Sequence, residues 1–159
     1  MNKLSIRAVF AVLVAFGLTV AAAGGGSDPV AGMWHLDAAK STFGSGPAMK
    51  SQTRMYSQSG HEISLVMTTT TADGKEVTTK TTYQLDGKDY PVTGSADYDS
   101  LSGKQIDANT AEFTLKKGGK KVGTTTRMVS ADGKTLTSKM SMMLASGEKA
   151  EQSLVFHKK

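Results

Sequence analysis

Apolar and polar residues alternate along most of the chain after residue 24. In "EISLVMT", Ile63, Leu65 and Met67 fall on one face of an extended segment, and in "AEFTLK" Phe113 falls opposite Glu112. A period of two residues is typical of half-buried antiparallel strands, and this region has no long segment with the 3.6-residue period of a helix. The pattern therefore predicts an all-β protein.

Turn sequences that contain glycine separate the alternating segments. "ADGK" occurs at 72–75 and again at 131–134, and "KKGGKK" occurs at 116–121. Asp-Gly and Gly-Gly supply the positive φ angles that tight hairpins need. These turns predict a meander with one long excursion at 37–50. The predicted strands cover residues 31–37, 50–59, 61–71, 76–86, 99–107, 110–117, 120–130, 134–144 and 150–158, with a further short strand at 89–94.

A meander of this length can protect its edges by closing into a barrel or by splitting into two packed sheets. Connections made mostly of hairpins favour closure, so we predict a single antiparallel up-and-down barrel of eight to ten strands. The similar segments "TADGKEVTTK" (71–80) and "SADGKTLTSK" (130–139) fit either two similar hairpins or a duplicated meander.

Residues 1–23 have the organisation of an export signal. Lys3 and Arg7 precede the apolar run "AVFAVLVAFGLTVAAA", and Ala21 and Ala23 fit an A-x-A cleavage site. An uncleaved anchor is the alternative, although the run is shorter than the roughly 20 residues of a spanning helix. We expect a periplasmic or secreted protein with no membrane span after cleavage. The predicted organisation is a signal peptide at 1–23, a flexible N-terminal segment at 24–30 and a barrel domain at 31–159.

Composition narrows the classes of partner. The chain contains no cysteine, so the fold must be held by packing and hydrogen bonds without disulfides. The formal net charge is +5, and the basic residues are scattered apart from "KKGGKK". Lysines at a solvated hairpin tip explain that run better than nucleic acid does, because few aromatic residues lie among the charges. We expect no nucleic-acid partner.

The residues give little indication of catalysis or metal binding. There is no cysteine nucleophile and no Gly-x-Ser-x-Gly elbow, and acids such as Asp73 and Asp132 lie in predicted turns, where aspartates bind their own backbone. A Ser/His/Asp arrangement assembled by the fold stays an alternative. His35 and His157 would be neighbours in a closed barrel, but His61 lies at a hairpin, and their spacing favours ordinary histidines over a zinc site. We expect no enzyme, no metal and no cofactor.

The predicted inner walls hold many methionines and small hydroxylated residues. One wall comprises alternate residues of 77–83, another Thr124, Thr126 and Met128, and a third Met140 and its neighbours. Such walls either enclose a cavity for a small molecule, to which adaptable methionines are suited, or form a filled core with threonines as strand formers. The candidate ligand-binding residues are Thr79, Thr81, Tyr83, Tyr98, Phe113, Met128, Met140 and Met142.

The segment "GMWHLDAAKSTF" (32–43) contains the single tryptophan, Trp34, which either stacks on a ligand or closes the barrel. Gly32-Met33-Trp34 on a first strand, followed by a meander, resembles the lipocalin or calycin superfamily. The chain also resembles uncharacterised exported bacterial proteins with a lipocalin-like domain. Further segments that carry this resemblance are "DGKDYPVTG" (86–94), "IDANT" (106–110), "KKGGKKV" (116–122) and "RMVSADGKTLT" (127–137).

The resemblance implies a small antiparallel barrel and no particular activity. It implies that Trp34 lies across the closed end, with Gly32 letting the backbone pass close and a basic side chain packed on the ring. Lys158 or Lys159 is the first candidate for that side chain and Arg127 the second. The predicted function is that of an exported protein that binds a small apolar or amphipathic molecule at the opposite mouth. The alternative is an envelope structural or interaction module with a filled barrel.

Overall fold

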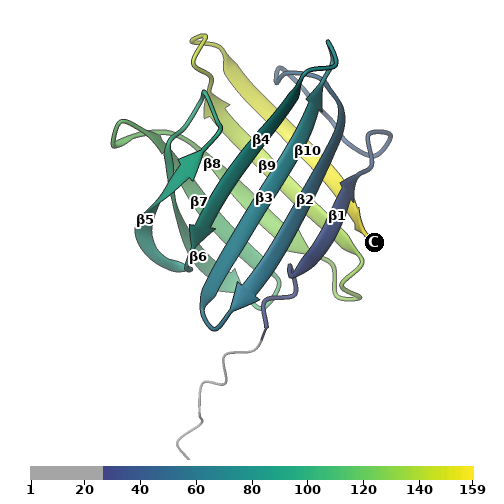
Figure 1. The fold of residues 1–159 in the computed structure, drawn as a ribbon, viewed down its shortest axis with the longest axis vertical. Coiled ribbons are helices and arrows are strands. Elements are labelled where there is room, and N and C mark those ends of the chain that lie inside the picture. The colour runs from purple at the N-terminus through teal and green to yellow at the C-terminus, as the bar shows by residue number, and fades with distance from the viewer. Residues whose placement is uncertain (1–26) are drawn as a thin grey trace, which may run out of the picture.

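The computed structural model describes residues 27–159, which form ten β-strands and no helix (Figure 1). The export signal predicted at 1–23 lies outside the described residues. Within them, no helix is long and apolar enough to cross a membrane. The strands are β1 (Gly32–Leu36), β2 (Met49–Ser59), β3 (Glu62–Thr71), β4 (Glu76–Tyr83), β5 (Asp86–Thr93), β6 (Ser100–Asp107), β7 (Thr110–Lys117), β8 (Lys120–Val129), β9 (Thr135–Met143) and β10 (Lys149–Lys158).

The strands close into one antiparallel barrel. Each strand pairs with its neighbours in sequence, and β1 also pairs with β10, where Trp34 lies opposite Lys158. Figure 1 shows the strands inclined around a common axis, with the C-terminus beside β1. The prediction of a closed up-and-down barrel is confirmed, and the alternative of two packed sheets is wrong.

The predicted hairpin glycines have the required backbone conformation. Gly74 and Gly133, each directly after an aspartate, have φ angles of +89° and +70°. The predicted short strand at 89–94 is longer than expected, because β5 already begins at Asp86. It pairs with β4 only at Lys80↔Thr93 and Thr81↔Val92, so the ladder between β4 and β5 is the shortest in the barrel.

The long excursion after β1 is held against β10. Thr42 and Ser153 exchange two backbone hydrogen bonds of 2.8 Å. A Cβ atom on Gly44 would lie 2.2 Å from the carbonyl oxygen of Glu151, so a larger residue would push this segment off the strand. Because β1 ends at Leu36, the segment of residues 37–48 supplies partners for the part of β10 that β1 does not reach.

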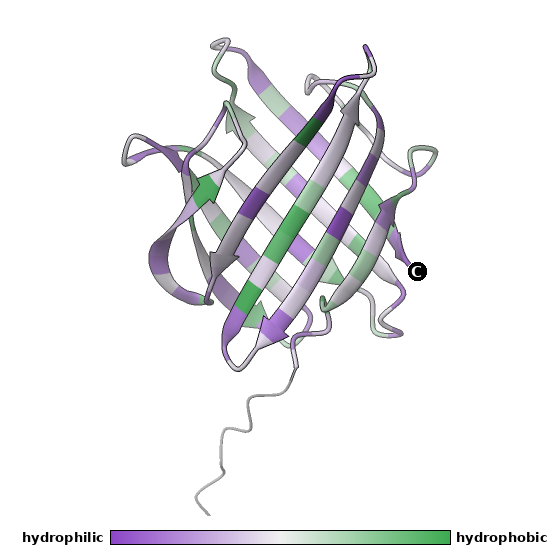
Figure 2. Ribbon diagram, viewed as in Figure 1, coloured by the Kyte–Doolittle hydropathy of each residue, from purple (hydrophilic) through white to green (hydrophobic). Residues whose placement is uncertain are grey.

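The inner faces of the strands form a single core. Figure 2 shows apolar and polar residues alternating along the strands. This is the pattern expected where one face of a sheet is buried and the other is solvated. The buried apolar residues are Val30, Trp34, Tyr56, Ile63, Tyr83, Val92, Leu101, Ala111, Phe113, Leu115, Val129, Leu136, Met142, Ala150, Leu154 and Phe156.

The two faces of β8 are the reverse of the prediction. Met128 was expected inside with Thr124 and Thr126, but its side chain is 41% exposed, whereas Arg127 is 3% and Val129 2% exposed. Period-two alternation does not say which face is buried when both faces carry threonines. Here the inward face is the one whose arginine finds hydrogen-bonding partners inside the barrel.

Trp34 closes one end of the barrel. Its side chain is fully buried, and its Nε1 donates a 2.7 Å hydrogen bond to the carbonyl oxygen of Val30. The Lys158 Nζ lies 5.1 Å from the centroid of the Trp34 ring, within the range of a cation–π contact. Gly32 makes room for this lysine, because a Cβ atom there would lie 2.6 Å from Lys158 Cε.

Residues just before β1 belong to the closed end. Val30 is buried, and the backbone N–H of Asp28 donates to Gln58 Oε1 at 2.6 Å. Residues 24–30 were expected to be flexible, with the domain starting at residue 31. The structure instead ties Asp28 and Val30 into the barrel, because the closed end needs side chains that β1 alone does not supply.

We expect Trp34→Ala to lower the free energy of unfolding by about 3–5 kcal/mol, because it leaves a large void at the closed end. Chemical denaturation followed by circular dichroism measures this loss without relying on tryptophan fluorescence. Met33→Ala is the matched control, since Met33 is the adjacent residue and is 42% exposed, and its effect should stay within about 0.5 kcal/mol. Equal stability of the two variants would contradict the closing role of Trp34.

Candidate functional site

A cavity of about 340 Å³ occupies the barrel interior. Its rim carries residues from the ends of strands and from loops opposite the closed end: Pro47 before β2, Thr71 at the end of β3, Ala96 between β5 and β6, and Leu144 after β9. Trp34 does not line it. The cavity therefore opens at the mouth away from the tryptophan.

Most of the predicted ligand-binding residues face this cavity, and two do not. Thr81 is buried, but its Oγ1 donates a 2.9 Å hydrogen bond to the carbonyl oxygen of Pro91 and supports the short β4–β5 ladder. Met128 lies on the outer surface, for the reason given above. Those that line the cavity are Thr79, Tyr83, Tyr98, Phe113, Met140 and Met142.

Several polar residues of the cavity were missed by the sequence analysis. Gln52, Arg54 and Tyr56 occupy alternate positions of β2 and all line the cavity. Arg127 of β8 lines it too. Polar residues at i and i+2 normally mark the solvated face of a strand, so alternation gave no reason to place them inside. The direction in which these side chains point is determined by which face of the neighbouring strands is buried.

The floor of the cavity is built around Arg127. Its Nη2 forms an ion pair with Asp28, and its Nη1 donates a 3.0 Å hydrogen bond to the Tyr83 hydroxyl. The guanidinium carbon lies 5.7 Å from the Phe113 ring centroid and 5.9 Å from that of Tyr56. Arg127 therefore contacts these rings, not Trp34 as its role of second candidate would require, and Asp28 neutralises its charge.

Tyr83 is the other buried polar group of the floor. Burial raises the pKa of its hydroxyl above the ordinary value of 10.0, and the positive charge of Arg127 opposes this rise. The Phe113 ring meets the Tyr83 ring edge-on, with centroids 5.3 Å apart. The phenol is therefore neutral at physiological pH and is a hydrogen-bonding part of the floor.

Arg54 lies on the wall of the cavity and is half-buried. Its Nε donates to Gln52 Oε1 at 2.9 Å, and Gln52 Nε2 donates to Thr69 Oγ1 at 2.8 Å. The guanidinium carbon lies 4.4 Å from the Phe156 ring centroid. Among residues 27–159, no carboxylate lies within 4.0 Å of Arg54. Unlike Arg127, Arg54 therefore has no counter-ion in this part of the chain.

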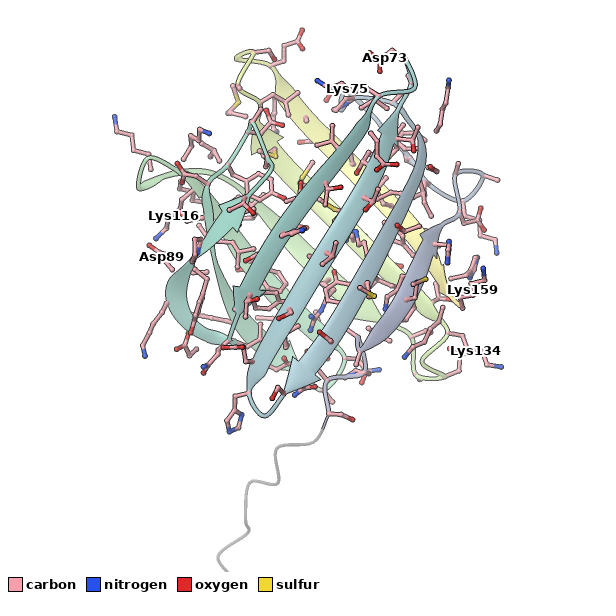
Figure 3. The ribbon with its side chains drawn as sticks, viewed as in Figure 1. Asp73, Lys75, Asp89, Lys116, Lys134 and Lys159 are labelled. Carbon is pink, nitrogen blue, oxygen red and sulfur yellow. The ribbon has the colours of Figure 1, made fainter. Side chains whose placement is uncertain are left out.

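His157 and the surface acids make ordinary surface contacts, whereas the buried Nε2 of His35 has no hydrogen-bond partner within residues 27–159. His35 lies opposite His157 in the β1–β10 ladder, and His157 Nε2 lies 2.8 Å from Asp37 Oδ2, a hydrogen bond that lowers the pKa of that carboxyl. Figure 3 shows Asp89 and Lys116 pointing toward one another, and they form a 2.7 Å ion pair. No three His, Cys, Asp or Glu side chains of residues 27–159 are grouped to hold a metal ion.

The closed meander with an internal cavity has the fold of the calycin-like barrels. The M. tuberculosis protein Rv2717c is similar in structure, with a TM-score of 0.54 and 15% sequence identity over 82% of this chain and 93% of that chain. The zebrafish ileal bile acid-binding protein, in its complex with cholic acid, is similar with a TM-score of 0.50 and 12% identity over 82% of this chain and 99% of that chain. At these identities the likeness is one of fold. No protein-family model and no curated protein matches the chain.

We expect Asp28→Asn to lower the free energy of unfolding by about 3–5 kcal/mol, because Arg127 would stay buried without its counter-charge. Asparagine keeps an oxygen that can accept from the Val30 backbone N–H, as Asp28 Oδ1 does at 2.9 Å. The matched control is Asp89→Asn, which breaks the half-exposed ion pair with Lys116 and should cost no more than about 1 kcal/mol. Denaturant titrations that gave the same loss for both variants would refute a stabilising role specific to Asp28.

Proposed function

We propose that this protein is an exported binding protein that holds a small apolar or amphipathic molecule inside its barrel. The observation that carries the proposal is the cavity of about 340 Å³ that opens away from Trp34. Its volume lies within the range of about 300–1,000 Å³ that is usual for small-molecule sites. A barrel whose inner positions were all filled by large side chains would leave no such space.

The composition of the walls supports an apolar or amphipathic ligand. Leu65, Met67, Met140 and Leu154 supply apolar surface, and a few arginines and tyrosines add polar groups. Ligand sites generally combine a mostly apolar lining with a small number of placed polar groups. The zebrafish ileal bile acid-binding protein, a barrel of the same fold, was crystallised with cholic acid, so an amphipathic ligand is compatible with this architecture.

The alternative of an interaction module with a filled barrel is less well supported. It requires a solid interior, which the cavity contradicts. It also predicts a contiguous apolar patch on the surface. Within residues 27–159, the large exposed apolar side chains are instead distributed over five strands, β1, β2, β6, β8 and β9, and only Met33 and Met55 are paired across a ladder.

Binding is tested with N-phenyl-1-naphthylamine, a neutral apolar probe whose fluorescence rises in a dry site. We expect saturable binding that Thr79→Phe weakens about tenfold or more, equivalent to about 1.4 kcal/mol, because the ring would occupy cavity volume. Thr78→Phe is the matched control, since Thr78 is exposed on the opposite face of β4. Circular dichroism verifies that both variants fold. No saturable binding by the wild type, or equal binding by the two variants, would contradict the proposal.

Export is tested by separating the cytoplasm, the envelope and the culture medium of the cells that make the protein, and isolating the protein from the fraction that contains it. Cleavage after Ala23 leaves Asp28 and Val30 in place, so the mature chain keeps its closed end. We expect an intact mass and an N-terminal sequence beginning at Gly24, and native mass spectrometry of the same sample should show a bound small molecule. A cytoplasmic protein that retains Met1 would overturn the export proposal without affecting the binding proposal.

A further inference from the structure

The cavity holds two arginines, and only one is neutralised by the described chain. Arg127 pairs with Asp28, whereas Arg54 has no carboxylate within 4.0 Å among residues 27–159. Taking a guanidinium out of water without a counter-charge is costly, so a partly buried cation needs water or an anion beside it. The wall of the cavity therefore carries a positive charge that residues 27–159 do not neutralise.

Arg54 is held in one orientation. Gln52 accepts from its Nε at 2.9 Å and is itself bound to Thr69, and one face of the guanidinium covers the Phe156 ring at 4.4 Å. Its terminal Nη1 and Nη2 atoms have no hydrogen-bond acceptor within residues 27–159. A planar guanidinium with both terminal nitrogens free suits bidentate binding of a carboxylate or a similar anion, and fixing it beforehand reduces the entropy lost on binding.

Two tyrosines line the same cavity with their hydroxyls unbonded. Within the described part of the chain, neither the Tyr56 nor the Tyr98 hydroxyl makes a hydrogen bond, although both side chains are largely enclosed. Burial raises the pKa of Tyr98, although the Arg54 charge opposes that rise, so the phenol is protonated at physiological pH. A protonated phenol donates a hydrogen bond, and two such donors near a guanidinium complement an anionic oxygen.

The remaining charges place the anion site on the wall and not at the floor. Arg127 is already bound by Asp28 and Tyr83. Asp97, the only carboxylate in the cavity lining, lies in the loop at the mouth, where its Oδ1 accepts from the Ala145 N–H at 2.9 Å. A negatively charged head group inside the cavity would therefore find one uncompensated cation, which is Arg54.

We propose that the ligand is a singly charged anionic amphiphile whose head group binds the Arg54 guanidinium together with the hydroxyls of Tyr56 and Tyr98. The apolar part of such a molecule contacts the leucines and methionines of the walls. This inference rests on the proposed binding function and narrows it to one charge class. Neutral and cationic amphiphiles of the same length would leave Arg54 without a counter-ion.

The charge class is tested by displacing N-phenyl-1-naphthylamine from the mature chain with decanoate, decanol and decyltrimethylammonium at pH 7.5. These compounds share one alkyl length and differ in head-group charge. We expect decanoate to displace the probe at a concentration about tenfold or more below that of decanol, and the cation to be weakest. If the probe binds but decanoate and decanol displace it at equal concentrations, the anion inference fails and the binding function stands. If the probe does not bind, the binding function fails first.

The position of the head group is tested with Arg54→Gln. We expect this variant to lose the preference for decanoate over decanol while still binding the probe. Lys80→Gln is the matched control, because it removes the same charge from an exposed position on the outer face of β4, and it should keep the preference. A decanoate preference that persists in Arg54→Gln would place the head group elsewhere and overturn the proposal.

Tyr98→Phe tests the same site with a smaller change, which matters if Arg54→Gln does not fold. Loss of one hydroxyl donor should weaken the binding of decanoate several-fold, because a hydrogen bond to a charged group contributes more than one to a neutral group. The binding of decanol should be unchanged. Equal weakening of decanoate and decanol would show that Tyr98 acts on the shape of the cavity and not on the charge, and would contradict its assigned role.

Discussion

Pairing of β1 with both β2 and β10 is the constraint on which the rest of this structure depends. A short first strand, Gly32–Leu36, turns an open meander into a barrel with an inside and an outside. Closure places Trp34 across one end, and it lets the long segment after β1 cover the remaining part of β10. Because one end is sealed by the tryptophan and by Val30, any solvent-connected space in the barrel must open at the other end.

Closure also determines how charge is handled in the interior. A cation on an inward face cannot reach bulk water as it would on an open sheet, so each interior arginine needs partners within the barrel. Arg127 obtains them from Tyr83 and from Asp28, a residue that precedes the first strand. Arg54 is oriented by Gln52 and Phe156, but no carboxylate of residues 27–159 neutralises it. The same fold thus gives one interior arginine a counter-ion and leaves the other without one among residues 27–159.

Sequence patterns in this chain predict structure correctly where they act over a few residues. Hairpins were located correctly because Asp-Gly and Gly-Gly specify a local backbone geometry, as at Gly74 and Gly133. The inner face of β4 was assigned correctly because one of its two faces carries the large aromatic side chain of Tyr83, which favours burial. In β8 both faces carry threonines, so the same reasoning pointed Met128 inward. The polar residues of the cavity were missed because burial of an arginine depends on partners far away in the sequence, as burial of Arg127 depends on Asp28.

Local patterns in this chain were enough to specify the strands, the turns and a closed all-β architecture, since period two and positive-φ glycines act over a few residues. They also marked Trp34 as a residue of the closed end through its resemblance to the first strand of lipocalins. Which face of each strand is buried, which side chains neutralise a charge and where space remains depend on contacts between distant segments. The cavity, the paired Arg127 and the unpaired Arg54 therefore became visible only once the barrel brought β2, β8 and the residues before β1 together.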